Sequence, residues 1–254
     1  MPLIEYVVKD RIAYITLNRP EKLNALTHEM LDGLWKAYTD VKNNPDAWLA
    51  IVTGTGRAFS VGHDLVEMSK KSATERSSGS TDELYFYQQH IWKPIIAAVN
   101  GLCLAQGAGI AMGADIIVAS EQAQFGWPQT KRGLSSISGP VILSHKVPLN
   151  RALEVLFTGE FISAAEAKSL DLINYVVPAD QLMPKAEEIA LKILQNAPLA
   201  VRGMKEASMR ALHMSLHDRL NIATMVFERV AKTEDAKEGL KAFQEKRPPT
   251  WQGR

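Results

Sequence analysis

Three short apolar runs recur between stretches of helical pattern, and they constrain the fold more than any other feature of the chain. The runs read WLAIVTG (48–54), KPIIAAVNG (93–101) and IIVASE (116–121). Continuous apolar runs of this length are typical of strands buried on both faces, as in a parallel sheet. Thr27 can cap a helix before the first run, and the small residues of 107–115 form a helix before the third. This alternation predicts an α/β fold with a parallel sheet and helical crossovers.

From Ser138 onward the pattern becomes almost wholly helical. Ser163 and Glu166 fit a capping box at the start of one helix. The run INYVV predicts one more strand before Pro178. Amphipathic patterns predict helices near 180–196, 198–212, 216–231 and 235–246. We therefore predict a β/α core over 1–190 and a helical carboxyl-terminal region over 191–254.

The balanced charge of the chain argues against nucleic acid or a membrane surface as a partner. There are 29 basic and 28 acidic residues, so no strong field of either sign is expected. No apolar stretch approaches about 18 residues, and the first residues lack the pattern of a signal peptide, so we expect a cytoplasmic protein. The single cysteine, Cys103, lies in an apolar run without a nearby histidine, which favours a buried structural thiol. We expect no metal site.

Two glycine-containing loops could supply backbone amides to a ligand. In AFSVGHDL, which we expect to be a loop, Gly62 allows a tight turn and leaves the N–H of Val61 facing outward. At Gln106 and Gly107 the chain enters a helix, whose first amides have no intrahelical acceptor and lie at the positive end of the dipole. Two such amides converging would form an oxyanion hole for a carbonyl oxygen. The alternative is that both loops are ordinary tight turns.

The chain resembles the enoyl-CoA hydratase/isomerase superfamily, also called the crotonases. The matching stretches, in order along the chain, are RPEKLNAL, IVTGTGRAFSVGHDL, KPIIAAVNGLCLAQGAGIAMGADIIVAS, AQFGWPQTKRGL, LFTGEFISAAEAKSLDLINYVV, APLAVRGMKE and EDAKEGLKAFQEKR. The resemblance implies a spiral of ββα units and a helical carboxyl-terminal region, 191–254, that forms a homo-trimer or a hexamer of paired trimers. It also implies an acyl-CoA thioester substrate, with coenzyme A as part of the substrate and no separate cofactor.

The resemblance assigns roles to particular residues. The oxyanion-hole amides correspond to Val61 and Gln106. The positions that correspond to contacts with the adenine, pantetheine and acyl parts of the substrate are Lys22, Leu23, Ala25, Gly62, His63, Asp64, Leu65, Gly107, Gly109 and Trp127. Lys246 corresponds to a basic position that approaches the CoA phosphates, either within the chain or from a neighbouring subunit; the alternative is a solvated surface lysine.

Both catalytic carboxylates of the hydratases are missing from this sequence. The family motif places its two glutamates at Gly109 and Gln129. Glycine has no side chain, and an amide cannot act as an acid or a base near neutral pH. General acid–base catalysis contributes about 100- to 10,000-fold per group, so the usual hydration route is disfavoured. The double-bond isomerases of the family also use a carboxylate in this region, so the same objection applies to that reaction.

The remaining polar candidates are few. His63 follows the glycine turn and resembles the histidine of the methylmalonyl-CoA decarboxylase branch; it either takes part in the chemistry or binds backbone or CoA. We expect Asp64 to fix its turn through backbone N–H groups and Asp115 to brace a strand. Ser138, among Ser135, Ser136 and Ser138, is expected to cap a helix rather than to act as a nucleophile. Trp127 either lines the acyl pocket or packs in the core.

These residues favour an acyl-CoA enzyme of the lyase or isomerase class that stabilises a thioester enolate without two-glutamate hydration. Decarboxylation fits best, because an enolate held by an oxyanion hole needs little acid–base help. The alternatives are a thioester hydrolase in which Gln129 and the serines position water, a non-catalytic acyl-CoA-binding protein, and a divergent hydratase. In the last, His63 or the polar segment 70–82, which we expect to be mobile, would supply the acid and base.

Overall fold

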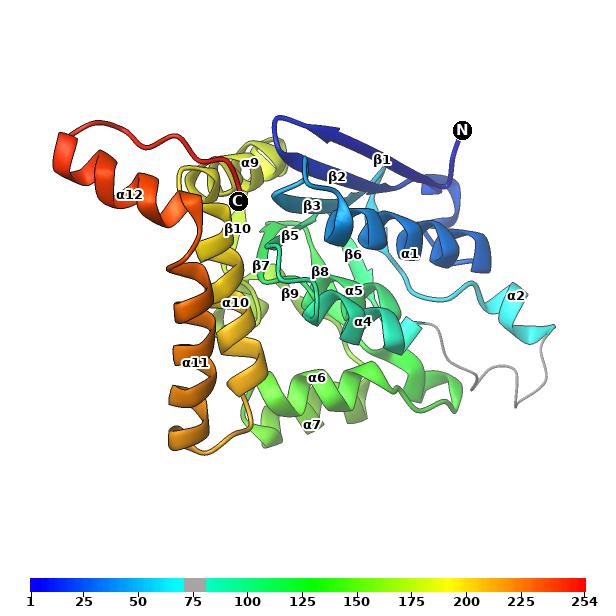
Figure 1. Cartoon of the computed structure of the whole chain (residues 1–254). Coiled ribbons are helices and arrows are strands. Elements are labelled where there is room, and N and C mark those ends of the chain that lie inside the picture. Colours follow the sequence, from blue (N-terminus) through cyan, green and yellow to red (C-terminus); the bar gives the residue numbers. More distant parts are fainter. Residues whose placement is uncertain (71–80) are drawn as a thin grey trace.

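The larger of two sheets forms the centre of the molecule (Figure 1). The structure, a computed structural model, describes residues 1–70 and 81–254. The larger sheet has the order β1-β2-β3-β5-β7-β10, with β1 and β2 antiparallel and the other pairs parallel. Its strands are β1 (Ile4–Lys9), β2 (Ile12–Leu17), β3 (Leu49–Gly54), β5 (Ile95–Val99), β7 (Ile116–Ser120) and β10 (Tyr175–Val177). The predicted parallel sheet is confirmed. The prediction of a mobile segment at 70–82 falls mainly on residues outside the described part.

A second sheet runs beside the first, in the order β4-β6-β8-β9. Its strands are β4 (Ala58–Ser60), β6 (Leu102–Leu104), β8 (Gln124–Gly126) and β9 (Ile162–Ser163). The strands β4, β6 and β8 each follow a strand of the first sheet and precede helix, which is the repeated ββα unit predicted from the resemblance. The expectation that AFSVGHDL is a loop throughout was wrong, because Ala58–Ser60 is buried and pairs with β6.

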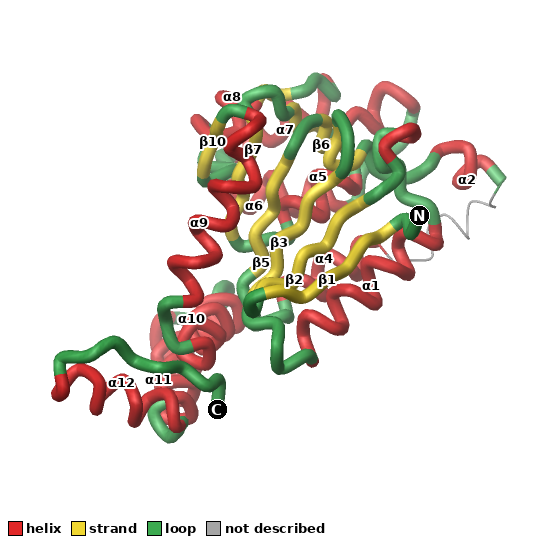
Figure 2. Tube along the Cα trace, turned by 90° about the horizontal axis from the view of Figure 1, so that it is seen from above, coloured by secondary structure: helices red, strands yellow, loops and turns green. Residues whose placement is uncertain are grey.

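Helices cover both faces of the larger sheet (Figure 2). Helix α1 follows Thr27, whose hydroxyl accepts the Met30 N–H as predicted. In β3, Ala50 and Val52 pack on the face beneath α1, while the alternate residues pack against α9. The helices are α1 (His28–Asn43), α2 (Leu65–Ser69), α4 (Thr81–Gln89), α5 (Gln106–Met112), α6 (Ser138–Lys146), α7 (Leu149–Thr158), α8 (Ala164–Ser169), α9 (Leu182–Leu194), α10 (Pro198–Ala211), α11 (Leu216–Val230) and α12 (Glu234–Glu245). The short 3-10 helices are η1 (Pro20–Lys22), η2 (Pro128–Arg132) and η3 (Ala179–Gln181).

The last three helices extend away from the sheets on the side opposite α2, as Figures 1 and 2 show together. The predicted boundary between residues 190 and 191 falls inside α9, and α9 itself packs on the larger sheet. The change of architecture therefore comes after α9, and α10 to α12 form the helical region. No helix in the described ranges is long and apolar enough to cross a membrane.

Two side chains have the structural roles expected of them. Asp115 accepts the Ile95 N–H at 2.8 Å, which braces the start of β5, and forms an ion pair with Lys205 at 2.7 Å. Cys103 lies on β6 with no exposed surface, and burial raises the pKa of its thiol. Both predictions are confirmed.

Candidate functional site

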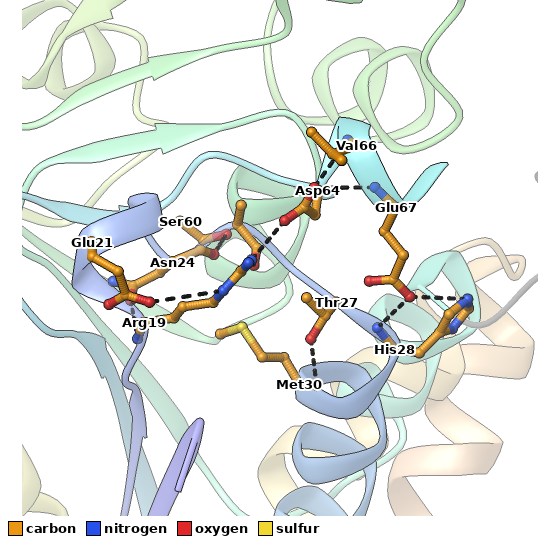
Figure 3. Close-up of polar contacts among 11 residues, drawn as sticks. Arg19, Glu21, Asn24, Thr27, His28, Met30, Ser60, Asp64, Val66 and Glu67 are labelled. Carbon is orange, nitrogen blue, oxygen red and sulfur yellow. Dashed lines mark hydrogen bonds and ion pairs between the residues drawn. The ribbon is translucent and has the colours of Figure 1, made fainter. Parts of the chain in front are cut away.

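The site begins at a tight turn held by the fully buried side chain of Asn24 (Figure 3). Asn24 adopts a left-handed conformation with φ +54°, which asparagine tolerates better than most residues. Its Oδ1 accepts the N–H of Arg19 at 2.7 Å, and its Nδ2 donates to the carbonyls of Thr55 and Ala58 at 3.0 and 2.8 Å. The hydroxyl of Ser60 donates to the Asn24 carbonyl at 2.8 Å. The turn is therefore fixed to the strand that leads into the Gly62 loop.

Backbone hydrogen bonds join this turn directly to the glycine loop. The Leu26 N–H donates to the Gly62 carbonyl at 2.8 Å, and the Asp64 N–H donates to the Leu26 carbonyl at 3.0 Å. The Val61 N–H donates to the Leu23 carbonyl at 3.2 Å. The expectation of an outward-facing Val61 amide is therefore wrong, because pairing with the turn uses that amide. The structure does bring the segment of Leu23 and Ala25 together with the loop that contains Gly62, as the resemblance implied.

Asp64 holds the loop after the glycine turn (Figure 3). Its Oδ1 accepts the N–H groups of Val66 and Glu67 at 3.0 and 3.2 Å, which confirms the predicted turn-fixing role. Its Oδ2 forms a 2.8 Å ion pair with Arg19, and the two side chains are only 14% and 18% exposed. The hydrogen bond from Arg19 is the main reason that the pKa of Asp64 lies below its usual value. Arg19 is a structural residue of the site that no sequence pattern indicated.

The Gly62 loop also meets the start of α5. Gly62 has φ +86°, and a methyl group there would lie 2.8 Å from the Ala105 Cβ and 3.1 Å from the Gln106 backbone nitrogen. A methyl group at Gly107 would lie 2.2 Å from the Ser60 carbonyl oxygen. Gln106 is the first residue of α5, as predicted. These contacts leave no room for side chains at the two glycines, so the backbone of the loop and the first turn of α5 are in contact.

The position that corresponds to the first glutamate is surrounded by neutral polar groups. A methyl group at Gly109 would lie 3.2 Å from Nε2 of Gln106 and 3.3 Å from Oγ of Ser138. Gln106 is 5% exposed and Ser138 is 6% exposed. The Gln106 side chain therefore lies along its own helix beside Gly109. Ser138, on α6, lies beside Gly109 as well.

The serine that caps α6 is not the one that was expected to do so. Ser136 caps the helix, because its Oγ accepts the Gly139 N–H at 2.9 Å. Ser138 is already the first helical residue, so the prediction that it caps was wrong. Its hydroxyl makes no capping hydrogen bond at the start of α6. Because α6 begins at Ser138, Ser136 takes the capping role and the Ser138 hydroxyl does not.

Trp127 and Gln129 lie on the loop that follows β8. Trp127 is 1% exposed and belongs to the main hydrophobic core, so core packing, one of its two predicted roles, is confirmed. A methyl group at Gly139 would lie 2.7 Å from its Cδ1, which places the indole against the start of α6. The indole N–H and the Oε1 of Gln129 are buried and have no hydrogen-bond partner among the described residues.

His63 lies between the glycine turn and α2 and is partly buried. Burial lowers the pKa of its imidazole, and the nearby Glu67 carboxylate opposes this effect only in part. Glu67 also lies 3.7 Å from Nε2 of His28 at the start of α1 (Figure 3). His63 is therefore a neutral imidazole near pH 7, able to donate or accept a hydrogen bond.

The other predicted contact residues lie at different distances from this centre. Leu23, with φ +53°, and Ala25 flank Asn24, and Arg19 Nη1 donates to the Ala25 carbonyl at 3.0 Å. Lys22 ends η1 and Leu65 begins α2, and both are exposed. Lys246 follows α12 and is exposed. In Figures 1 and 2, α12, which Lys246 follows, lies far from α2, which Leu65 begins.

A family model described as enoyl-CoA hydratase/isomerase matches residues 8–254. A putative enoyl-CoA hydratase of Thermus thermophilus is 36% identical over 248 residues, which are 96% of this chain and 98% of the relative. The short-chain-enoyl-CoA hydratase of Clostridium acetobutylicum is also 36% identical, over 93% of this chain and 92% of its own length.

Solved structures are similar over nearly the whole chain. The crystal structure of enoyl-CoA hydratase from Bacillus anthracis superposes with a TM-score of 0.94 at 33% identity and covers 99% of this chain and 100% of that one. An enoyl-CoA hydratase/isomerase from Mycobacterium paratuberculosis gives a TM-score of 0.89 at 41% identity, with 99% of each chain covered.

Proposed function

Because the chain belongs to the enoyl-CoA hydratase/isomerase family, we propose that it binds an acyl-CoA thioester, stabilises its enolate with two backbone amides, and decarboxylates it. Coenzyme A enters as part of the substrate. The contact between the Gly62 loop and the first turn of α5 is the observation that supports this proposal, because each of these two segments would contribute one of the amides.

The two amides in this proposal are those of Gln106 and His63. Leu26 and His63 form a parallel β-bridge, in which Leu26 bonds the Gly62 carbonyl and the Asp64 amide. A residue bridged in this way points its own N–H to the opposite side. The His63 amide therefore points away from the Asn24 turn. It replaces the Val61 amide in the role that the resemblance implied, and the Gln106 amide keeps its role.

Decarboxylation suits this site because it needs no carboxylate from the protein. The bond between Cα and the substrate carboxylate breaks, carbon dioxide leaves, and the electron pair forms an enolate. The enolate oxygen is stabilised by the two amides, and a proton from water then adds to Cα. A neutral His63 can donate a hydrogen bond to the carboxylate without neutralising it, so the charge is still free to move toward the thioester.

Enoyl-CoA hydration is the second candidate, and the names of the relatives favour it. The protein of Clostridium acetobutylicum is named a short-chain-enoyl-CoA hydratase, and the similar structures are named enoyl-CoA hydratases. In this chain, Gly109 and Gln129 occupy the positions at which the resemblance places the two glutamates. Hydration would then require a proton carrier of another kind, and His63 is the titratable side chain nearest the Gly62 turn along the chain.

The test compares His63→Ala with His28→Ala. Both remove an imidazole near Glu67, but only His63 lies beside the glycine turn. We expect His63→Ala to abolish release of carbon dioxide from malonyl-CoA while leaving the thermal shift with butyryl-CoA nearly unchanged, and His28→Ala to retain both. Normal decarboxylation by His63→Ala would contradict the role of the imidazole. Binding without any reaction would indicate a non-catalytic acyl-CoA-binding protein.

We also propose that α10 to α12 form the contact between copies in a homo-trimer or hexamer. Large apolar side chains stand exposed along these helices, among them Met204 (75%), Leu216 (75%), Phe227 (70%) and Phe243 (85%). Exposed apolar surface of this kind is typical of an oligomer interface. Lys246 could then reach the CoA site of a neighbouring copy. Light scattering after size-exclusion chromatography tests this proposal, and a monomer at micromolar concentration would contradict it.

A further inference from the structure

Two histidines lie against one another where α6 meets the connection between α10 and α11 (Figure 1). The ring centres of His145 and His213 are 5.3 Å apart, and the ring planes are inclined to each other by 59°. His145 lies in the last turn of α6, and His213 lies in the turn that follows α10. Both residues are exposed. The fold thus places two imidazoles, which are the commonest metal ligands in proteins, side by side at the surface.

The separation of the two rings fits a tetrahedral metal ion. A zinc ion lies about 2.0 to 2.1 Å from an imidazole nitrogen, and the ring centre lies about 1.15 Å beyond that nitrogen. Two rings on one tetrahedral ion therefore have centres about 5.2 Å apart. Ligands at a right angle, as in an octahedral site, would place the centres about 4.5 Å apart. The observed 5.3 Å agrees with the tetrahedral value.

The turn that carries His213 is held in place by its neighbours. Arg219 donates through Nε to the Met214 carbonyl and through Nη2 to the Leu212 carbonyl, at 3.0 Å each. The Met214 N–H donates to the Ala211 carbonyl at 3.1 Å. Because the backbone on both sides of His213 is already fixed, a metal ion would have to order little more than the side chain, which lowers the entropic cost of binding.

The electrostatic setting favours a cation. The helices α6 and α10 end at Lys146 and Ala211, and the carboxyl end of a helix dipole attracts positive charge. The ammonium group of Lys146 opposes this attraction and weakens the site. No group of three or more histidine, cysteine, aspartate or glutamate side chains in the described ranges could hold a metal ion. The protein therefore supplies two ligands, and water fills the other positions.

We propose that His145 and His213 bind one zinc ion, with water in the two remaining tetrahedral positions. The ion joins α6 to the α10–α11 connection. Two protein ligands bind zinc more weakly than the four of a structural site, so the ion exchanges reversibly. The site departs from the expectation of no metal site, because its two histidines come from segments distant in the sequence. It is independent of the proposed function, since neither histidine belongs to the candidate site.

Calorimetric titration with zinc chloride tests the proposal, on protein without a histidine tag that has been dialysed against a chelator. His145→Ala and His213→Ala each remove one ligand. His90→Ala is the matched control, because His90 is also exposed and its ring also contacts an aromatic ring, that of Trp92, at 5.8 Å. Magnesium chloride is the control ion, because magnesium prefers oxygen ligands.

We expect the wild type and His90→Ala to bind one zinc ion per chain with equal affinity and to bind no magnesium at the same concentration. Either substitution at the site should weaken zinc binding by at least about 10-fold. Zinc should also raise the thermal midpoint of the wild type more than that of His145→Ala or His213→Ala. Absence of zinc binding by the wild type, or equal binding by the wild type and both site variants, would overturn the proposal and leave a plain contact between rings.

Discussion

Replacing Asp64 by asparagine tests whether the Arg19–Asp64 ion pair holds the glycine loop in place. Asparagine keeps an oxygen that can accept the Val66 and Glu67 amides and so retains the helix cap. It removes the charge that faces Arg19 at 2.8 Å, where the two side chains are only 14% and 18% exposed. The substitution therefore isolates the ion pair from the cap.

The burial of the pair sets the size of the expected effect. Hydrogen bonds between charged groups contribute about 1.5 to 3 kcal/mol, and removing one partner of a buried pair costs more than removing an exposed one. We expect Asp64→Asn to lower the free energy of unfolding by about 1.5 to 3 kcal/mol and to weaken binding of butyryl-CoA. Asp46→Asn is the matched control, because Asp46 pairs with Arg11 at the surface. The Asp46 side chain is 73% exposed and that of Arg11 is 49% exposed. That exposed pair should contribute less than about 1 kcal/mol.

The pH dependence gives a second readout of the same pair. The pKa of Asp64 lies below its usual value in the folded protein, chiefly because of the hydrogen bond from Arg19. Its contribution is complete above the ordinary aspartate pKa and is lost as the pH falls through the lowered value. Urea titrations should therefore show the gap between wild type and Asp64→Asn narrowing below about pH 4. Equal losses for Asp64→Asn and Asp46→Asn at pH 7 would refute the reasoning.

Three further substitutions or modifications follow from the structure. Gly62→Ala should lower the unfolding free energy in urea titrations by about 1 to 3 kcal/mol and abolish thioester binding, because φ is +86° and the methyl group meets α5; normal binding would contradict the contact. Cys103 should react with a thiol reagent in a colorimetric assay only after unfolding, and rapid labelling of the folded protein would show that it is accessible. Glu206→Gln should cost about 1 to 3 kcal/mol in the same titrations, because Arg210 and Arg229 hold its buried carboxylate ionised despite desolvation. Since the pKa of Glu206 is lowered, this difference should shrink in acid, and a constant difference would contradict it.

The longer elements of the fold are predictable because their patterns are local. β3 is apolar on both faces, and both faces are covered, so its continuous apolar run was sufficient. The residue patterns alone did not indicate the second sheet, which only the resemblance implied, because β4, β6 and β8 have three residues each. A strand of that length shows no periodicity, and only its pairing with neighbours distant in sequence defines it.

The site shows the same division between local and distant causes. Gln106 could be placed at the start of a helix from its neighbours alone. The Arg19–Asp64 pair joins residues 45 positions apart, so no local pattern indicates it. The direction of the Val61 amide depends on pairing with Leu23, and the role of Ser138 depends on the residue at which α6 begins. These details are set by tertiary contacts.

A comparison of two reactions tests the central claim, that this site stabilises an enolate without two catalytic carboxylates. The protein and the Clostridium acetobutylicum hydratase would each be given crotonyl-CoA and malonyl-CoA, with products followed by mass. We predict loss of carbon dioxide from malonyl-CoA by this protein, and addition of water to crotonyl-CoA at least about 100-fold slower than by the hydratase. Hydration at the rate of the hydratase, without release of carbon dioxide, would contradict the claim.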